Sequence, residues 1–194
     1  MGASKFQHYA KTDYNIDLTE DEAWEMRNRF FESYPGLPEW HRAMRSFVGE
    51  HQYVRALHGA LRTLPSIRSS DEGVAAMAQR QAINSPVQRF ASDLGLIGLN
   101  MFASSAPSDL MRVIMFIHDA VIIEAHEDHA QEAMSSIRWM LENPPLEDWF
   151  DIEAPLPIVA DVSVGPNLGE MEEVEVPSVC PAWFDMQQHV EQML

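Results

Sequence analysis

The sequence predicts an α+β fold in which helices pack on a small antiparallel sheet. The chain has 194 residues, of which 46% are hydrophobic and 22% charged, as in an ordinary globular chain with a core. Helical spacing of apolar residues covers 18–34, 37–50, 74–102 and 127–141, and short β-branched runs lie between these segments. From residue 74 onward the order is helix, strand, strand, helix, strand, which is typical of α+β domains.

The first predicted helix follows Thr19. Residues 1–15 show aromatic side chains without a clear period, so no element is predicted there. Thr19 is a good N-cap, and Glu22 follows three residues later as in a capping box. Pro35-Gly36 interrupts the chain, and a second short helix is expected over 37–50.

A hairpin and a long helix are predicted next. The segment 52–65 has two short β-like stretches around His58-Gly59-Ala60, which indicates a tight turn. From Val74 to Phe102 the sequence is alanine-rich and periodic, with one interruption at Ser85-Pro86. Because proline inside a helix removes a hydrogen bond, the pattern predicts one long, kinked helix.

The last elements include a second hairpin. The β-branched runs 112–116 and 121–123 flank His118-Asp119, which is expected at the hairpin tip. Residues 127–141 form an amphipathic pattern, and 156–164 is predicted to be a strand. An acidic, proline-containing stretch and a candidate terminal helix complete the chain over 167–194.

Charge and cysteine content narrow the functional classes. The net charge is −17, but residues 1–95 carry 11 basic against 12 acidic groups, whereas 96–194 carry 2 against 18. Charge alone therefore argues against nucleic-acid binding, although the arginine-bearing first half keeps it open. The single cysteine, Cys180, excludes an internal disulfide framework and a cysteine-rich zinc site. No apolar run approaches about 18 residues and the N-terminus lacks an apolar signal core, so no membrane association and no secretion are expected.

His118-Asp119 is the first candidate site, a polar pair between the apolar runs IMFI and VIIE. A carboxylate at a hairpin tip stays partly solvated and can bind a hard cation such as Mg²⁺ through oxygen. The residues leave open a plainer interpretation, because β-turns favour Asp without any function.

The second candidate is the segment RQAINSPVQR. At helical spacing Arg80, Asn84 and Gln88 share one face, and such side chains can contact base edges or sugars in a nucleic-acid groove. A merely solvated polar helix face has the same pattern. The opposite face would be core, with Ala78, Ala82, Ile83, Val87, Ala91 and Leu94.

Other motifs carry less chemistry. His126 and His129 are three residues apart, but no third ligand is evident, so a structural zinc site is not expected. The sequence contains neither a glycine-rich phosphate loop nor a G-x-S-x-G nucleophile motif.

Taken in order, these segments resemble the C-terminal part of family A DNA polymerases, the bacterial DNA polymerase I type. FFESYPGLPEWH is similar to the helix and turn after the nucleotide-binding helix, and YVRALHGALRTLP to a fingers segment that usually carries G-R-R-R. AQRQAINSPVQRFASDL resembles the palm helix R-x-A-x-N-x-P-x-Q, MFIHDAVIIEA resembles motif C, and LPIVADVSVGPN the final palm strand. The resemblance covers about residues 1–167.

The resemblance implies a division of the chain and a set of roles. Residues 1–72 would be the C-terminal part of helical fingers, 73–166 a portion of the antiparallel palm with motif C, and 167–194 an acidic tail with a terminal helix. Asp119 would be the motif C carboxylate that holds Mg²⁺, and His118 would lie near the primer terminus. Arg80, Asn84 and Gln88 would contact the minor groove of the primer–template DNA. Arg62 would contact the DNA backbone.

Departures from the family pattern shape the functional expectation. Ala120 stands where the family usually has Glu, Arg62 is the one Arg left of three, and nothing matches motif A or the nucleotide-binding helix. One aspartate cannot hold two metal ions. We therefore expect a split DNA-directed DNA polymerase that is inactive alone. An N-terminal chain would complete the two-ion Mg²⁺ site, dNTP and primer–template DNA would be the substrates, and the location would be the cytoplasm of a bacterial or phage-infected cell.

Two other functions remain open from the sequence. Ala120 and the thinned arginine segment favour a catalytically inactive DNA-binding or scaffold remnant of such a polymerase. A small metal-dependent hydrolase using Asp119 and Glu124 is a further alternative, although a strand separates the two carboxylates. The tail 167–194 is expected to be either a docking helix for the partner chain or a solvated extension.

Overall fold

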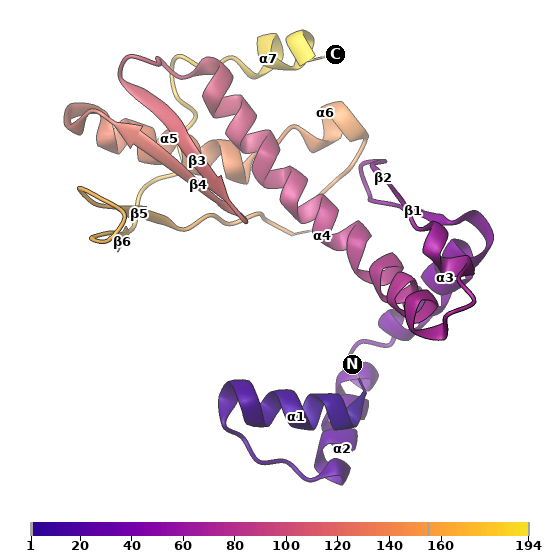
Figure 1. Ribbon diagram of the computed structural model, residues 1–194. Coiled ribbons are helices and arrows are strands. Elements are labelled where there is room, and N and C mark those ends of the chain that lie inside the picture. Colours follow the sequence, from indigo (N-terminus) through magenta and orange to yellow (C-terminus); the bar gives the residue numbers. More distant parts are fainter. Residues whose placement is uncertain (1, 155, 194) are drawn as a thin grey trace. The chain divides into compact units, whose positions relative to one another are not determined.

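The computed structural model describes residues 2–154 and 156–193, and its helices and strands are drawn in Figure 1. Contacts divide the chain into two compact units. Unit 1 comprises Met1–Val54 and Leu61–Ser85, and unit 2 comprises Arg55–Ala60 and Pro86–Leu194. Helices and small antiparallel sheets give the predicted α+β class. The segments predicted from the family resemblance, 1–72, 73–166 and 167–194, are functional divisions and stay a prediction.

Unit 1 begins with three helices, α1 (Ala3–Tyr14), α2 (Glu20–Ser33) and α3 (Gly36–His51). The capping box at the start of α2 is confirmed: the Thr19 N–H donates to Glu22 Oε2 at 2.8 Å, and the Glu22 N–H donates to Thr19 Oγ1 at 3.2 Å. Helix α1 was not predicted, because only two small residues of it, Ala3 and Ala10, are buried and leave no apolar stripe to read.

A short hairpin completes the core of unit 1. Strands β1 (Tyr53–Arg55) and β2 (Leu61–Thr63) form a two-stranded sheet, and η1 (Pro65–Arg68) follows. Gly59 has a φ of 94°, which favours glycine in this turn. One hydrophobic cluster of this unit lies around the hairpin and consists of the buried residues Val48, Val54, Leu64 and Ala82, with Ile67 packed against them.

The long helix is confirmed as α4 (Glu72–Ser105), which contains Pro86 and passes from unit 1 into unit 2. Its predicted core face is only partly right. Ala78, Ala82 and Ile83 are buried, but Val87 is 60% exposed and Ala91 is exposed as well. Helical spacing predicted the buried face of α4 correctly within unit 1. Within unit 2 the helix buries other residues instead, such as Met101 and Phe102.

Unit 2 is built around the second hairpin, which is also confirmed. Strands β3 (Met111–Ile117) and β4 (Ala120–Ala125) pair antiparallel, with a bulge between Val113 and Met115. After η2 (Glu127–His129), helix α5 (Ala130–Glu142) packs near α4. Gly98 permits this approach, since a Cβ there would lie 2.7 Å from Leu141 Cδ2. The core of the unit consists of Met101, Phe102, Met111, Ala133, Ile137, Met140 and Phe184.

The predicted strand over 156–164 is mostly wrong. Only β5 (Val162–Val164) is a strand, and it pairs with β6 (Glu172–Val174). Leu156 and Val159 are exposed, so the apolar run there does not reflect burial in a sheet. A short helix, α6 (Leu146–Phe150), precedes this region.

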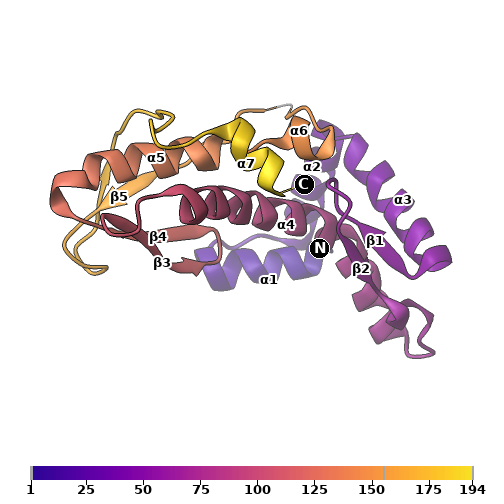
Figure 2. The same ribbon diagram turned by 90° about the horizontal axis from the view of Figure 1, so that it is seen from above.

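The C-terminal segment packs on unit 2 and ends in the predicted helix, α7 (Met186–Met193). Phe184 belongs to the core, and Arg138 Nη1 donates to the carbonyl of Val176 at 2.7 Å. Figure 2 shows this segment returning to the side of α4 and α5. Val176, Phe184 and His189 of this segment are buried, whereas 167–173 is exposed, so the choice between a docking helix and a solvated extension stays a prediction. None of the described helices combines the length and the apolar character needed to cross a membrane.

Candidate metal and nucleic-acid site

Asp119 lies at the tip of the hairpin β3–β4. Ile117 and Ala120 are the last paired residues, so His118 and Asp119 form a two-residue turn. His118 has a φ of 56°, as the first turn position of a tight hairpin requires. Both side chains are exposed, and Asp119 makes no hydrogen bond or ion pair with another described residue. Its carboxylate oxygens are therefore available as ligands for a hard cation.

The described residues offer Asp119 alone at this tip. Over 2–154 and 156–193, no group of three or more His, Cys, Asp or Glu side chains is arranged to hold a metal ion. Glu124 is already engaged, because Arg112 Nε and Nη2 donate to its Oε2 at 2.8 and 2.6 Å across the hairpin. This pairing weighs against a hydrolase that uses Asp119 and Glu124 together. The donor set suits Mg²⁺ in kind, but supplies one ligand of the several that the ion needs.

The second predicted set lies on α4. Arg80, Asn84 and Gln88 share the predicted helix, and Arg80 and Asn84 are exposed, as side chains that contact a large ligand must be. Arg80 and Asn84 belong to unit 1 and Gln88 to unit 2, since the unit boundary follows Ser85. Arg62 is exposed on β2 in unit 1.

One polar cluster of unit 2 was missed by sequence reasoning. Asp93 Oδ2 lies 2.7 Å from His58 Nε2 and accepts a hydrogen bond from Arg89 Nε at 2.5 Å, with the side chains of His58 and Asp93 mostly buried. His58 also packs against Phe90 and Phe150. The spacing of Arg89 and Asp93 by four residues on a helix could have revealed half of the cluster. The contact to His58 joins residues far apart in the chain, for which the sequence holds no signal.

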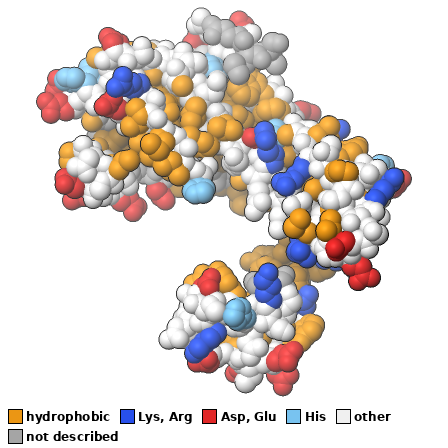
Figure 3. All heavy atoms as spheres, viewed as in Figure 1, with side chains coloured by type: hydrophobic (Ala, Val, Ile, Leu, Met, Phe, Trp, Pro, Cys, Tyr) orange, Lys and Arg blue, Asp and Glu red, His pale blue; other side chains and the backbone are white. Residues whose placement is uncertain are grey.

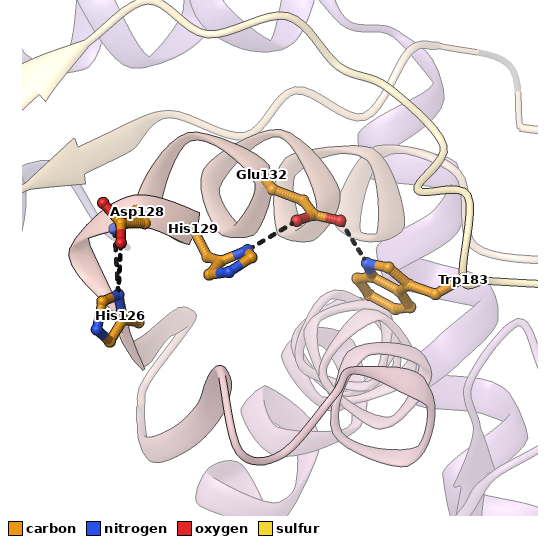
Figure 4. A network of polar contacts seen from close by, with 5 residues as sticks. All are labelled: His126, Asp128, His129, Glu132 and Trp183. Carbon is orange, nitrogen blue, oxygen red and sulfur yellow. Dashed lines mark hydrogen bonds and ion pairs between the residues drawn. The ribbon is translucent and has the colours of Figure 1, made fainter.

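The histidines after β4 are committed to local contacts, as Figure 4 shows. His126 Nδ1 accepts from the Asp128 N–H at 3.3 Å. His129 Nδ1 lies 3.3 Å from Glu132 Oε2, and Trp183 Nε1 donates to Glu132 Oε1 at 2.9 Å. These contacts fix the start of α5 and attach the C-terminal segment to it.

Comparison with known proteins finds similarity to DNA polymerases throughout. The model of the family described as DNA polymerase family A matches residues 2–170. The DNA polymerase of Bacillus phage SP01 is 26% identical over 167 residues, covering 84% of this chain and 18% of that protein. DNA polymerase I of Pseudomonas aeruginosa is 28% identical over 80% of this chain and 16% of its own length, and the thermostable DNA polymerase I of Thermus filiformis is 30% identical over 75% and 17%.

A solved structure agrees at the level of the fold. The POL domain of Pol1 from M. smegmatis, in complex with DNA primer–template and dNTP, superposes with a TM-score of 0.62 at 20% identity. The match covers 81% of this chain and 26% of that one. The chain thus spans less than a fifth of the length of these curated relatives and about a quarter of the solved domain.

Proposed function

The chain belongs to DNA polymerase family A, and we propose that it contributes the C-terminal part of a DNA-directed DNA polymerase. In this role it provides the motif C aspartate, Asp119, and contacts to primer–template DNA for template-directed transfer of a nucleotide from dNTP. The polymerase relatives from bacteria and a Bacillus phage support a role in DNA replication within a bacterial or phage-infected cell.

The observation that carries the proposal is the exposed, unpaired carboxylate of Asp119 on a tight two-residue turn. Apolar strand residues flank the turn on both sides, so it presents one acidic group at a defined place. Asp119 would hold Mg²⁺, which in nucleotidyl transfer orients the primer 3′-hydroxyl and stabilises the charge that develops on the phosphate and leaving group. His118, beside it on the turn, would lie near the primer terminus.

DNA contacts come in this proposal from α4 and β2. Arg80, Asn84 and Gln88 would donate to minor-groove acceptors, which are similar for all correct base pairs. Amide and guanidinium groups there can sense pair geometry without reading sequence. Arg62 would contact the DNA backbone, where its guanidinium suits a phosphate.

A two-ion site requires further carboxylates, and in our proposal a separate N-terminal chain supplies them with motif A and the nucleotide-binding helix. Apolar side chains beside the turn support such a partner. Ile114, Met115 and Ile117 on β3 are 50%, 43% and 44% exposed. Hydrophobic side chains gather over this part of unit 2 in Figure 3. An exposed apolar strand is a suitable surface for a protein neighbour.

A second candidate function is a catalytically inactive DNA-binding or scaffold remnant. It is favoured by Ala120, which offers no carboxylate where the family pattern has Glu, and by Arg62 as the one arginine of its turn segment. In that case DNA binding and association with a partner would persist without nucleotide transfer.

Primer extension distinguishes the two. This chain, a matching upstream polymerase chain and their mixture are each given primer–template, dNTP and Mg²⁺. We expect only the mixture to extend the primer. Asp119→Ala should abolish this extension. Asp109→Ala, which removes another exposed aspartate of unit 2, should retain it. Activity of the lone chain, or full activity of the mixture with Asp119→Ala, would contradict the proposal. An inactive mixture that still binds DNA would support the remnant.

A further inference from the structure

A basic hollow on unit 1 involves none of the residues proposed to bind metal or primer–template DNA. Helices α2 and α3 border an open hollow of about 470 Å³. Three arginines line it, Arg27 from α2 and Arg42 and Arg45 from α3, together with His41. Among the described lining residues Glu32 is the one carboxylate, so the hollow carries an excess of positive charge.

Two of these arginines, Arg42 and Arg45, differ from the four described arginines that pair with a carboxylate, a difference that they share with Arg62 and Arg80. Within the described residues, Arg42 and Arg45 are exposed and make no hydrogen bond or ion pair. Four others each bind a carboxylate at 3.0 Å or less: Arg29 with Glu25, Arg89 with Asp93, Arg112 with Glu124 and Arg138 with Glu142. The structure therefore leaves two guanidinium groups without internal anions at the place where it also forms a hollow.

The third arginine is held in position by aromatic rings. The Arg27 guanidinium carbon lies 4.9 Å from the centre of the Phe31 ring and 5.2 Å from that of Trp24. Such cation–π contacts help to orient the guanidinium. Arg27 is half-buried, which makes its direction better defined than that of a solvated arginine.

The electrostatics of His41 are consistent with this excess of charge. Burial, and then the positive charge of Arg45, lower the pKa of His41 below its ordinary value. A neighbouring hollow of about 620 Å³ shares Arg27 and Arg45 and is also lined by Lys5 and Arg80, with no carboxylate among its described lining residues. The basic surface therefore continues across unit 1 beyond the first hollow.

We propose that the hollow between α2 and α3 is a phosphate-binding site that takes the backbone of a single-stranded DNA segment through Arg27, Arg42 and Arg45. Planar guanidinium groups bind phosphate oxygens in pairs, and several of them in one groove follow a strand without reading its sequence. The inference rests on the proposed function, because a DNA polymerase is what brings such a strand to unit 1.

The test measures binding of the full-length chain to a labelled dT oligomer of about ten nucleotides by anisotropy, in EDTA and at several salt concentrations. Arg42→Ala and Arg45→Ala are each expected to weaken binding several-fold and to reduce the salt slope by about 0.7 for each phosphate that the variant no longer binds. Glu32→Gln removes the carboxylate of the hollow and is expected to tighten binding. Arg29→Ala is the matched control, since this α2 arginine pairs with Glu25.

Two further readouts make the result specific. Circular dichroism checks that each variant stays folded, and NMR titration of His41 should show its pKa rising when the oligomer binds beside Arg45. Inorganic phosphate and a dNTP are run as competitors. One outcome is that phosphate or the dNTP displaces the oligomer from the wild type at concentrations that do not displace it from the Arg45→Ala variant. In that case the hollow binds free phosphate groups, and the proposal that it binds a DNA strand is overturned.

The inference is also overturned if Arg42→Ala and Arg45→Ala bind as the wild type does, or lose no more than Arg29→Ala. Because the assay uses neither Mg²⁺ nor an upstream chain, it is independent of primer extension. Extension that depends on Asp119 with no effect of the arginines would overturn this inference alone. Arginine-dependent binding without extension by the mixture would overturn the proposed function alone.

Discussion

Unit 1 and unit 2 differ most in how their charge is organised. Unit 1 carries nine basic and eleven acidic residues, whereas unit 2 carries four and nineteen. In unit 2, Arg89, Arg112 and Arg138 are each bound to a carboxylate, whereas Arg42 and Arg45 of unit 1 have no such partner among the described residues. In the proposed function, unit 1 would therefore meet phosphate with its own arginines, whereas Asp119 of unit 2 would act through a cation. A net charge of −17 does not exclude a nucleic-acid function when it is divided in this way.

The units also differ in their cores, and core truncation has the largest expected effect. Phe102→Ala in unit 2 should lower the free energy of unfolding by about 3–5 kcal/mol, because a fully buried aromatic ring is removed. Val48→Ala in unit 1 should cost about 2 kcal/mol, since two methyl groups are removed.

Denaturation followed by ¹⁹F NMR of 5-fluorotryptophan separates the units. Trp24 and Trp40 report on unit 1, and the others, Trp139, Trp149 and Trp183, report on unit 2. Each substitution should shift mainly the signals of its own unit. Equal shifts in both sets of signals would break the contrast and make the chain one cooperative body.

Loss of Arg80 should have the next largest effect and sharpens the contrast in DNA binding. Arg80→Ala is expected to weaken the affinity of the mixed chains for primer–template DNA about tenfold and to reduce the salt slope by about one. The slope falls because fewer counterions are released from DNA. Fluorescence anisotropy at several salt concentrations gives both quantities. Arg29→Ala, an exposed arginine paired with Glu25, serves as the reference, and an equal loss of affinity there would contradict a role for Arg80.

Mild acid should have the smallest effect and acts on both units in the same direction. Burial lowers the pKa of His189 in unit 2, and burial followed by the charge of Arg45 lowers that of His41 in unit 1. As the pH falls through the ordinary histidine value of about 6.5, the unfolded chain takes up protons that the folded chain resists. Stability should therefore decrease below this pH and be unaffected by these groups above it.

Urea denaturation between about pH 7.5 and 5.5 measures this dependence, with His189→Gln and His41→Gln as variants. Each should reduce the loss of stability in its own unit. If DNA occupies the hollow beside His41, the dependence in unit 1 should also weaken, whereas that of His189 should not change. A stability that rises on acidification would show that the sign is wrong.

Local signals predicted most of the fold. The capping box of Thr19 and Glu22, the hairpin turn at His118-Asp119 and the long helix through Pro86 each depend on residues a few positions apart, and each is present. Failures occur where burial depends on distant residues. Val87 has the spacing of a core residue but is exposed, and the run from Leu156 finds no partner strand except over Val162–Val164.

The candidate site was less predictable for the same reason. Asp119 is conspicuous in the sequence because it interrupts two apolar runs. By contrast, the contact between His58 and Asp93, and the hollow formed by Arg27 of α2 and Arg42 of α3, arise from tertiary packing. The spacing of Arg80 and Asn84 alone is compatible with either a DNA contact or a solvated helix face. Only the family resemblance favoured the DNA contact.

The central claim is that Asp119 of the acidic unit acts through a divalent cation. Its most direct test is dNTP binding to the mixed chains on a primer with a dideoxy end, which prevents extension, with and without Mg²⁺. Mg²⁺ should tighten dNTP binding to the wild type. This increase in affinity should be smaller by a factor of at least about ten in Asp119→Asn. In Asp109→Asn it should be unchanged. An Asp119→Asn variant that gains as much from Mg²⁺ as the wild type would contradict the claim.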